Sequence, residues 1–478
     1  MGGQVKVNSQ ISLSEALFSV FVLMALLAYN IFFADGVLLG DYSNQFILLI
    51  SSLLSFFIGL KNKISIAKIA VEVYKNFKSV FVPIMILFLV GALAGTWLVS
   101  GVIPAMVYYG LHILNPTIFL PASVLIAAII SIATGSSWTT SATVGIALVG
   151  IGTALGIAPG MVAGAVISGA YFGDKMSPLS DTTNLAPAMA GTDLFTHIKY
   201  MSLTTIPTLI VTLIVFTVIS FNISTTGDTD LSDMFDVITS TFYISPWLFL
   251  VPVAVIALIL LKVKPLLSLL SGVVLAAIFA IVFQAEVVQG ISESTMQAIM
   301  KSILTDVSIH TENEALNELF SSGGMKGMIW TILLICSAMI FGGVMEAIGA
   351  LSITTKSLLK MTTSIFGLFF STVASCLGLN LIASDQYLAI VIPGKMFKQA
   401  YEDKNLAPEN LSRTLEDSGT VTSVLIPWNT CGAYQSSVLG VSVSEYFFFA
   451  VFNYLSPITT LVFAAFNLKI RQIIKNKN

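Results

Sequence analysis

Two carboxylates, an ammonium group and several hydroxyls lie together in the segment Gly173–Asn184, between apolar runs at 161–172 and 185–190. A charge at the centre of a bilayer costs about 2.5–3.5 kcal/mol on insertion scales, so these groups must face a cavity and partly neutralise one another. Oxygen atoms are the ligands that a small hard cation such as sodium prefers. The segment offers such oxygens on Asp181, Ser177, Thr182, Thr183 and Asn184, and Pro178 frees backbone carbonyls beside them.

A carboxylate removed from water also holds a proton more tightly, so it can exchange one near neutral pH. One Asp that binds either a sodium ion or a proton, but not both, is the simplest device for exchanging the two. Asp181 is the leading candidate for that role. Asp174 stands next to Lys175, and an ion pair between them that eases insertion is as reasonable as a functional role.

Further oxygen-bearing side chains lie in two polar, turn-prone stretches elsewhere in the chain. The stretch Gly135–Ser141 contributes Ser136, Ser137 and Thr139, although small residues also serve simple helix packing. In the second stretch Asn380 precedes Ser384-Asp385-Gln386, and a carboxylate there is harder to explain as packing.

The helix that begins near Leu411 adds Asp417 and Thr420 as candidates for holding the ion or the proton. Its Glu416 can pair with Arg413 at i, i+3. Asn429 follows Pro427 and corresponds to Ser180 of the first stretch. Glu346, within an apolar Gly-rich helix, is either a proton-relay carboxylate or a group that reaches interfacial water. The expected metal ligands proper are Asp181, Asp385, Thr182 and Asn429.

The elements that must position these residues form two similar halves, offset by about 249 residues, so that Pro178 corresponds to Pro427. We expect re-entrant hairpins at 119–157 and 363–394, with polar tips near Gly135–Thr140 and Asn380–Gln386. Crossing helices at 160–195 and 408–440 should be unwound around Asp174–Asn184 and Gly419–Thr430. Inverted repeats with broken helices are the architecture of secondary transporters, with the binding site near the membrane midplane.

The amino-acid composition indicates that these elements lie in a lipid bilayer. Only 10% of the 478 residues are charged and 56% are hydrophobic, which excludes a soluble enzyme, a disordered protein or a nucleic-acid binder. The fold class is therefore an all-α polytopic membrane protein, with about ten crossing helices plus two re-entrant hairpins in two inverted repeats. The expected parts are N-terminal helices at 1–78, a first repeat at 79–221, connecting helices at 222–326 and a second repeat at 327–478. Clear spans are 13–33, 44–60, 79–100, 201–221, 247–261, 265–285, 327–350 and 445–467.

Loop charges set the orientation, because Lys and Arg favour the cytoplasmic side. The lysine-rich loop 61–78 and the tail with Lys475 and Lys477 are placed in the cytoplasm. The acidic loops 222–246 (with Asp228 and Asp230) and 286–325 are placed outside, the latter as a small amphipathic cap. Both termini are then cytoplasmic and the protein lies in the cell membrane.

Other chemistries find no support in the sequence. There is no Walker motif, so ATP is not the energy source. Three cysteines without a CxxC pair, and three isolated histidines, predict neither a disulfide nor a resident metal. An intramembrane enzyme would need a nucleophile or metal constellation that is not visible. We expect no cofactor, only transported ions.

At these residues the chain resembles the NhaC family of sodium/proton antiporters, within the ion transporter superfamily. The motifs that carry the resemblance are Ala133–Trp138, Gly169–Thr183, Ser384–Leu388, Pro393–Phe397, Leu411–Thr420 and Leu425–Ala433. The resemblance implies sodium/proton exchange, inverted repeats with hairpins, and a homodimer with elevator-type movement. The family pattern has Gly where this chain has Ser384, which affects the geometry of that tip.

The resemblance also implies an alternative, the exchange of a small organic acid such as malate or lactate coupled to these ions. An organic acid needs a cationic or helix-N-terminal anion site. Lys175, Arg413 and the backbone amides of the hairpin tips are the groups that could supply it.

Overall fold

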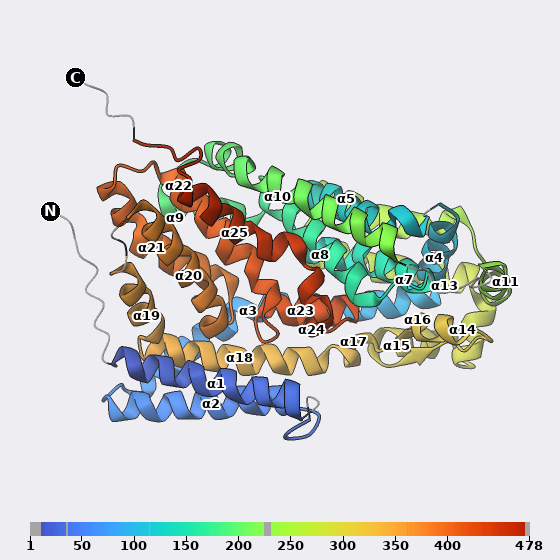
Figure 1. Ribbon diagram of the computed structural model, residues 1–478. Helices are drawn as coiled ribbons and strands as arrows, with labels where there is room; N and C mark the ends of the chain where they lie inside the picture. Colours follow the sequence, from blue (N-terminus) through green and yellow to red (C-terminus); the bar gives the residue numbers. More distant parts are fainter. Residues whose placement is uncertain are drawn as a thin grey trace.

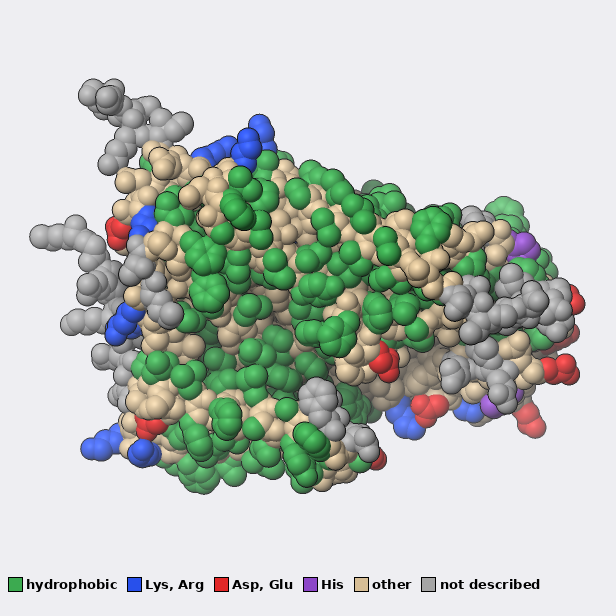
Figure 2. All heavy atoms as spheres, in the orientation of Figure 1, with side chains coloured by type: hydrophobic (Ala, Val, Ile, Leu, Met, Phe, Trp, Pro, Cys, Tyr) green, Lys and Arg blue, Asp and Glu red, His purple; other side chains and the backbone are tan. Residues whose placement is uncertain are grey.

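A computed structural model describes residues 11–34, 37–113, 115–223, 231–360, 362 and 364–473, and most of them are helical. Eight helices in this part are long and apolar enough to cross a membrane, or up to ten if each of two bent helix pairs counts as one span. Large apolar side chains cover the middle of the visible face (Figure 2). Many are strongly exposed, as Phe21 and Ile129 are at 69% and 65%. The protein is therefore an all-α polytopic membrane protein, as the composition predicts.

The first two helices form one side of the molecule (Figure 1), where α2 packs against α18 and α1 packs against α2 and α19. Their bounds are α1 (Leu13–Phe33), α2 (Ser43–Lys61), α3 (Ile66–Val99) and α4 (Val102–Ile113). The predicted loop 61–78 is wrong in extent, because α3 already begins at Ile66. Ser65 caps that helix by accepting a hydrogen bond from the Lys68 N–H, and the lysines of the expected loop lie mostly on its first turns.

The first repeat contains a hairpin, a broken helix and a long helix. The hairpin is α5 (Pro116–Thr134), α6 (Ser137–Thr140), the π-helical turn η1 (Ser141–Gly145) and α7 (Ile146–Ala154). The broken helix is α8 (Pro159–Met176) and α9 (Asp181–Ala190), and α10 (Leu194–Asn222) follows. The break covers 177–180 only, so the unwound stretch is shorter than expected and Asp181 already begins a helix.

The connecting part forms two membrane helices and a small cap. It comprises α11 (Leu231–Thr241), the 3₁₀ turn η2 (Pro246–Phe249), α12 (Leu250–Leu260), α13 (Pro265–Phe283), α14 (Ala285–Ile291), α15 (Thr295–Leu304), β1 (Val307–Ser308), α16 (Glu314–Leu319), β2 (Ser321–Ser322) and α17 (Gly324–Gly327). The two strands pair antiparallel. Residues 224–230, which include Asp228 and Asp230, lie outside the described part, as do the tail residues Lys475 and Lys477.

The second repeat has the same plan. Its elements are α18 (Ile329–Ala347), α19 (Ala350–Leu359), α20 (Ile365–Ala383), α21 (Gln386–Asp403), α22 (Pro408–Leu415), the π-helical turn η3 (Glu416–Thr420), the 3₁₀ turn η4 (Ser423–Leu425), α23 (Thr430–Leu439), α24 (Val443–Tyr446), the 3₁₀ turn η5 (Phe447–Phe449) and α25 (Val451–Ala465). The predicted unwinding over Gly419–Thr430 is wrong at its start, because the chain stays helical as η3 through Thr420.

The two repeats match residue by residue at the predicted offset of 249. Gly135 and Ser384 both have left-handed backbone at a hairpin tip, with φ of 70° and 59°, and the next residue in each case caps the returning helix. Helices α9 and α23 begin and end at equivalent positions, and Gly191 and Gly440 end them with positive φ. Ser131 Oγ donates to the Ala170 carbonyl at 2.6 Å, and the equivalent Asn380 Nδ2 donates to the Gly419 carbonyl at 2.7 Å.

The repeats are inverted relative to each other. Figure 1 shows α7 of the first hairpin at the end where α4 and α11 lie, whereas α21 of the second hairpin lies at the opposite end, beside α19. The two tips therefore approach the middle of the molecule from opposite sides, as inverted-repeat transporters require. The boundaries between the four expected parts of the chain, at residues 78, 221 and 326, stay predictions.

Close helix packing holds the first hairpin against the broken helix. A Cβ atom on Gly169 of α8 would lie 2.1 Å from the Val124 carbonyl oxygen of α5, and one on Gly173 would lie 2.5 Å from that of Ala128. Small residues of this kind let membrane helices touch backbone to backbone. The end of α8, which carries Asp174, is thereby fixed relative to the hairpin tip.

Candidate functional site: a carboxylate-lined cavity between the repeats

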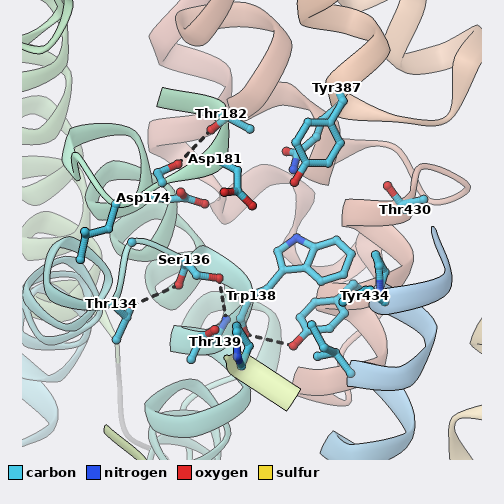
Figure 3. Close-up of a pocket in the computed structure, with 18 of the residues that line it drawn as sticks. Thr134, Ser136, Trp138, Thr139, Asp174, Asp181, Thr182, Tyr387, Thr430 and Tyr434 are labelled. Carbon is cyan, nitrogen blue, oxygen red and sulfur yellow. Dashed lines mark hydrogen bonds between the residues drawn. The ribbon is translucent and has the colours of Figure 1, made fainter. Parts of the chain in front are cut away.

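A cavity of about 550 Å³ lies where the two hairpin tips meet the two helix breaks. Three carboxylates from both repeats line it, those of Asp174, Asp181 and Asp385. Figure 3 shows the first-hairpin residues Ser136 and Thr139 on one side and Tyr387 of the second hairpin on another. The remaining wall comes from α3 and from the turn between α12 and α13, including Lys262. The cavity thus brings together acidic residues that are more than 200 positions apart in the chain.

Asp174 is held by the tip of the first hairpin. Its Oδ2 atom accepts hydrogen bonds from the Ser137 backbone N–H at 3.0 Å and from the Ser137 hydroxyl at 2.7 Å. These bonds compensate a negative charge next to the cavity and tie the hairpin tip to the end of α8. The alternative in which Asp174 pairs with Lys175 is wrong, because Lys175 points to another partner.

Asp181 is the carboxylate most open to the cavity. It is the first residue of α9, it is exposed, and its carboxylate accepts no hydrogen bond from the described residues. In Figure 3 its oxygens point into the space between Asp174 and Tyr387. The N-terminal end of a helix favours a negative charge, so this position suits a carboxylate that attracts a cation from the cavity.

Asp385 closes the same cavity from the second hairpin. It is 7% exposed and caps α21, since its Oδ1 atom accepts the Leu388 N–H at 3.0 Å. Ser136, the equivalent residue of the first tip, accepts the Thr139 N–H at 3.2 Å. The two hairpin tips therefore have the same backbone conformation and the same helix cap, but only the second tip carries a charge.

Neutral oxygens complete the lining. The hydroxyls of Thr182 and Ser180 lie 3.2 Å apart at the start of α9, and both residues line the cavity (Figure 3 labels Thr182). Thr139 and Thr430 also reach the cavity. A set of carboxylate and hydroxyl oxygens without thiol or imidazole suits a hard monovalent cation.

Other predicted site residues support the cavity from behind. Ser177 Oγ donates to the Ile132 carbonyl at 2.8 Å, and Thr183 Oγ1 donates to the Asp174 and Lys175 carbonyls at 3.2 and 3.1 Å. Asn184 Nδ2 donates to the Ser180 carbonyl at 2.7 Å, which secures the break. Asn429 caps α23 and donates to the Asn380 carbonyl at 3.1 Å. These side chains shape the two breaks rather than point into the cavity.

Three predicted residues lie apart from the cavity lining. Glu346 is half-buried within α18, Thr420 is buried in η3, and Asp417 is fully buried beside it. The Asp417 carboxylate forms a salt bridge with Lys175 and accepts hydrogen bonds from the hydroxyls of Thr204, at 2.8 Å, and of Thr460. Its oxygens are therefore already occupied by protein groups.

The predicted pair between Glu416 and Arg413 is also wrong. Both side chains are fully buried, but the described part of the chain contains no ion pair between them. The Arg413 guanidinium instead stacks over the Tyr200 ring, 4.6 Å from its centroid, and approaches Phe463. The Arg413 side chain is thus turned toward α10 and α25, which carry these two rings.

The sequence interpretation missed the aromatic walls of the cavity. Trp138 stacks on Tyr434 with ring centroids 3.9 Å apart, and the Tyr434 hydroxyl donates to the Trp138 carbonyl at 3.1 Å. This contact joins the first hairpin to the second repeat. The repeat offset of 249 could have indicated these walls, because it makes Tyr387 the equivalent of Trp138 and so gives each hairpin an aromatic residue just after its tip.

Replacing Gly135 by Ala should distort the first hairpin tip and strongly reduce transport. Gly135 has φ of 70°, and an added Cβ atom would lie 2.6 Å from the Leu179 Cβ and 2.8 Å from its carbonyl carbon. Gly156→Ala is the matched control, because Gly156 has φ of 75° with nothing within 4 Å of the added atom. We expect the control to lose about 1 kcal/mol of stability from backbone strain alone and to keep its transport rate. If the two variants had the same denaturation temperature and the same transport rate, the crowding of Gly135 against Leu179 would be contradicted.

A cavity lined by acidic side chains, between inverted repeats with re-entrant hairpins and broken helices, defines a multi-pass secondary transporter. Residues 169–468 match the model of the Na+/H+ antiporter family. The chain belongs to this family.

Three curated relatives cover most of the chain. It is 40% identical over 397 residues to the Na+/H+ antiporter NhaC of Alkalihalophilus pseudofirmus, covering 83% of this chain and 84% of that one. It is 37% identical to the Na+/H+ antiporter NhaC of Bacillus subtilis, covering 80% and 83% of the two chains. A malate-2H+/Na+-lactate antiporter of Bacillus subtilis is 34% identical, covering 85% and 86%. The resemblance to the NhaC family seen in the sequence motifs is thus confirmed.

Proposed function

We propose that this protein exchanges sodium ions for protons across the cell membrane by alternating access. The observation that carries the proposal is the convergence of Asp174, Asp181 and Asp385 on one cavity between the repeats. Membership of the Na+/H+ antiporter family supports the same function.

In this proposal Asp181 and Asp385 are the charged ligands of the sodium ion, and Thr182, Ser136 and Thr139 offer neutral oxygens beside them. Asp174, which is held in place by its hydrogen bond from the Ser137 hydroxyl, adds a third negative charge beside the sodium ion. A proton that binds to Asp181 removes the charge that attracts sodium, so the two ions exclude each other at this group. Sodium binding should therefore weaken as the pH falls, and a rise in pH should favour sodium over the proton.

The organic-acid alternative has less support from the geometry. Lys175 is neutralised by Asp417, and Arg413 is buried against aromatic rings away from the cavity lining. The tip amides are engaged too, since the Ser137 N–H donates to Asp174 and the Leu388 N–H to Asp385. Within the described residues, Lys262 is then the one cationic side chain among the cavity's three carboxylates. This cavity favours a cation over a dicarboxylate.

The proposed orientation places in the cytoplasm the end of the molecule where α1 starts and α25 ends. In Figure 1 the start of α1 and the end of α25 lie at the same end, and Figure 2 shows most of the visible Lys and Arg side chains near that end, with most Asp and Glu at the other. Positively charged segments favour the cytoplasmic side of a membrane. Because Lys262 and Pro265 of the α12–α13 turn line the cavity, we place its opening on the cytoplasmic side.

A homodimer stays a prediction, testable by cross-linking in native membranes.

Purified protein in sealed liposomes tests the function directly. An outward sodium gradient should drive protons in the opposite direction, as reported by a pH-sensitive dye, without any added organic acid. Proton movement that strictly requires malate or lactate would overturn plain exchange and support the alternative.

A further inference from the structure

Glu416 is a buried carboxylate that the sodium site does not use. It begins the π-helical turn η3, its side chain is 0% exposed, and neither carboxylate oxygen has a hydrogen-bond partner among the described residues. The Thr420 hydroxyl, one turn further along, is likewise buried without a hydrogen bond, and it lies near enough to act on the Glu416 carboxylate. Single π-helical turns within α-helices occur frequently at functional sites.

Neither buried cation near Glu416 pairs with it. The Arg413 guanidinium, three residues earlier, has no hydrogen-bond partner among the described residues and lies over the rings of Tyr200 and Phe463. Lys175 of α8 lies near enough to act on it electrostatically, but its ammonium group already binds Asp417 and donates to Ser456 at 3.0 Å. Further ionisable groups that act on Glu416 include Asp174 of α8, Asp417 of its own turn and the thiol of Cys376 on α20. Two of these are carboxylates, which oppose a further negative charge.

An ionised carboxylate without partners is very unfavourable in a membrane interior, whereas the protonated acid is tolerated far better. Burial, the missing partners and the neighbouring carboxylates therefore all favour a proton on Glu416 in this state. Its position links that proton to the cavity, because η3 packs against α9, the helix that begins with Asp181.

We infer that Glu416 is a second proton-binding site, separate from the cavity, which releases its proton when a sodium ion occupies the cavity carboxylates. A bound cation offsets the negative field of Asp174 and Asp181, and so removes part of the opposition to a charge on Glu416. The inference deepens the proposed function and rests on it. It assigns one proton to a group that does not touch the sodium ion.

Calorimetry of sodium binding to the purified protein tests this inference, with titrations in buffers of different ionisation enthalpy to count the protons released. Glu416→Gln should release about one proton fewer per sodium ion bound than the wild type. Glu409→Gln is the matched control, a Glu on the preceding helix whose carboxylate binds Arg471 at 2.6 Å, and it should release as many as the wild type. Equal release by Glu416→Gln and the wild type would overturn the inference alone. A wild type that binds no sodium would instead overturn the proposed function.

The stability of the same variant gives an independent readout. Gln closely matches the size and neutrality of a protonated Glu, so Glu416→Gln should fold and denature at the same temperature as the wild type. A variant that fails to fold, or that denatures well below the wild type, would show that the native side chain is ionised and held by an ionic contact, which overturns the assignment.

Discussion

Replacing Asp181 by Asn is expected to abolish sodium-driven proton exchange while leaving the protein folded. Asp181 is the exposed carboxylate of the cavity and has no protein partner to lose, so the substitution should cost little stability. It removes both the charge that attracts sodium and the group that takes the proton. Since even outer-shell partners of a metal site contribute about 10–100-fold to affinity, we expect sodium binding to weaken by at least about 100-fold.

Asp193→Asn provides the control for Asp181→Asn. Asp193 lies twelve positions further along, caps α10 by accepting the Thr196 N–H at 2.9 Å, and is not among the residues that line the cavity. Asn caps helices as well as Asp, so this variant should keep both fold and exchange. Exchange at the wild-type rate in Asp181→Asn, measured in the same liposomes, would remove Asp181 from the mechanism.

Replacing Asp417 by Ala is expected to be the most destabilising of the substitutions considered. Asp417 and Lys175 are both 0% exposed, and the change leaves an ammonium group buried without its counter-ion. Breaking a buried ion pair on one side costs about 3–5 kcal/mol. The variant should denature at a much lower temperature in detergent or fail to accumulate in the membrane.

The double variant Lys175→Met/Asp417→Ala should recover much of that loss, because it removes both charges together. Recovery would show that the pair acts mainly through charge compensation between α8 of the first repeat and η3 of the second. A single Asp417→Ala variant as stable as the wild type would contradict the buried ion pair.

The sequence predicted the local plan of the site well, because that plan depends on local chemistry. Gly135 with Ser136, and Ser384 with Asp385, are turn and cap residues wherever they occur, and their offset of 249 marks two equivalent hairpin tips. The breaks at Pro178 and Pro427 follow from the missing backbone N–H of proline. The membrane spans follow from apolar length alone.

What the sequence could not give was the partner of each charge. Neighbours in the chain made Asp174–Lys175 and Arg413–Glu416 natural pairs, yet Lys175 pairs with Asp417, 242 positions away. Such pairing depends on which helix faces are turned toward each other after the repeats pack, and one sequence carries no direct record of that. The unpartnered carboxylate of Glu416 was hidden for the same reason.

Sodium binding measured against pH tests the central claim most directly, with radioactive sodium and purified wild-type protein. If sodium and protons compete for the cavity carboxylates, the dissociation constant should rise as the pH falls, and should approach about tenfold per pH unit for each competing proton once those groups are mostly protonated. Asp181→Asn should lose most of the binding at every pH. Wild-type sodium binding that stays constant from mildly acidic to alkaline pH, or that survives in Asp181→Asn, would contradict a shared site.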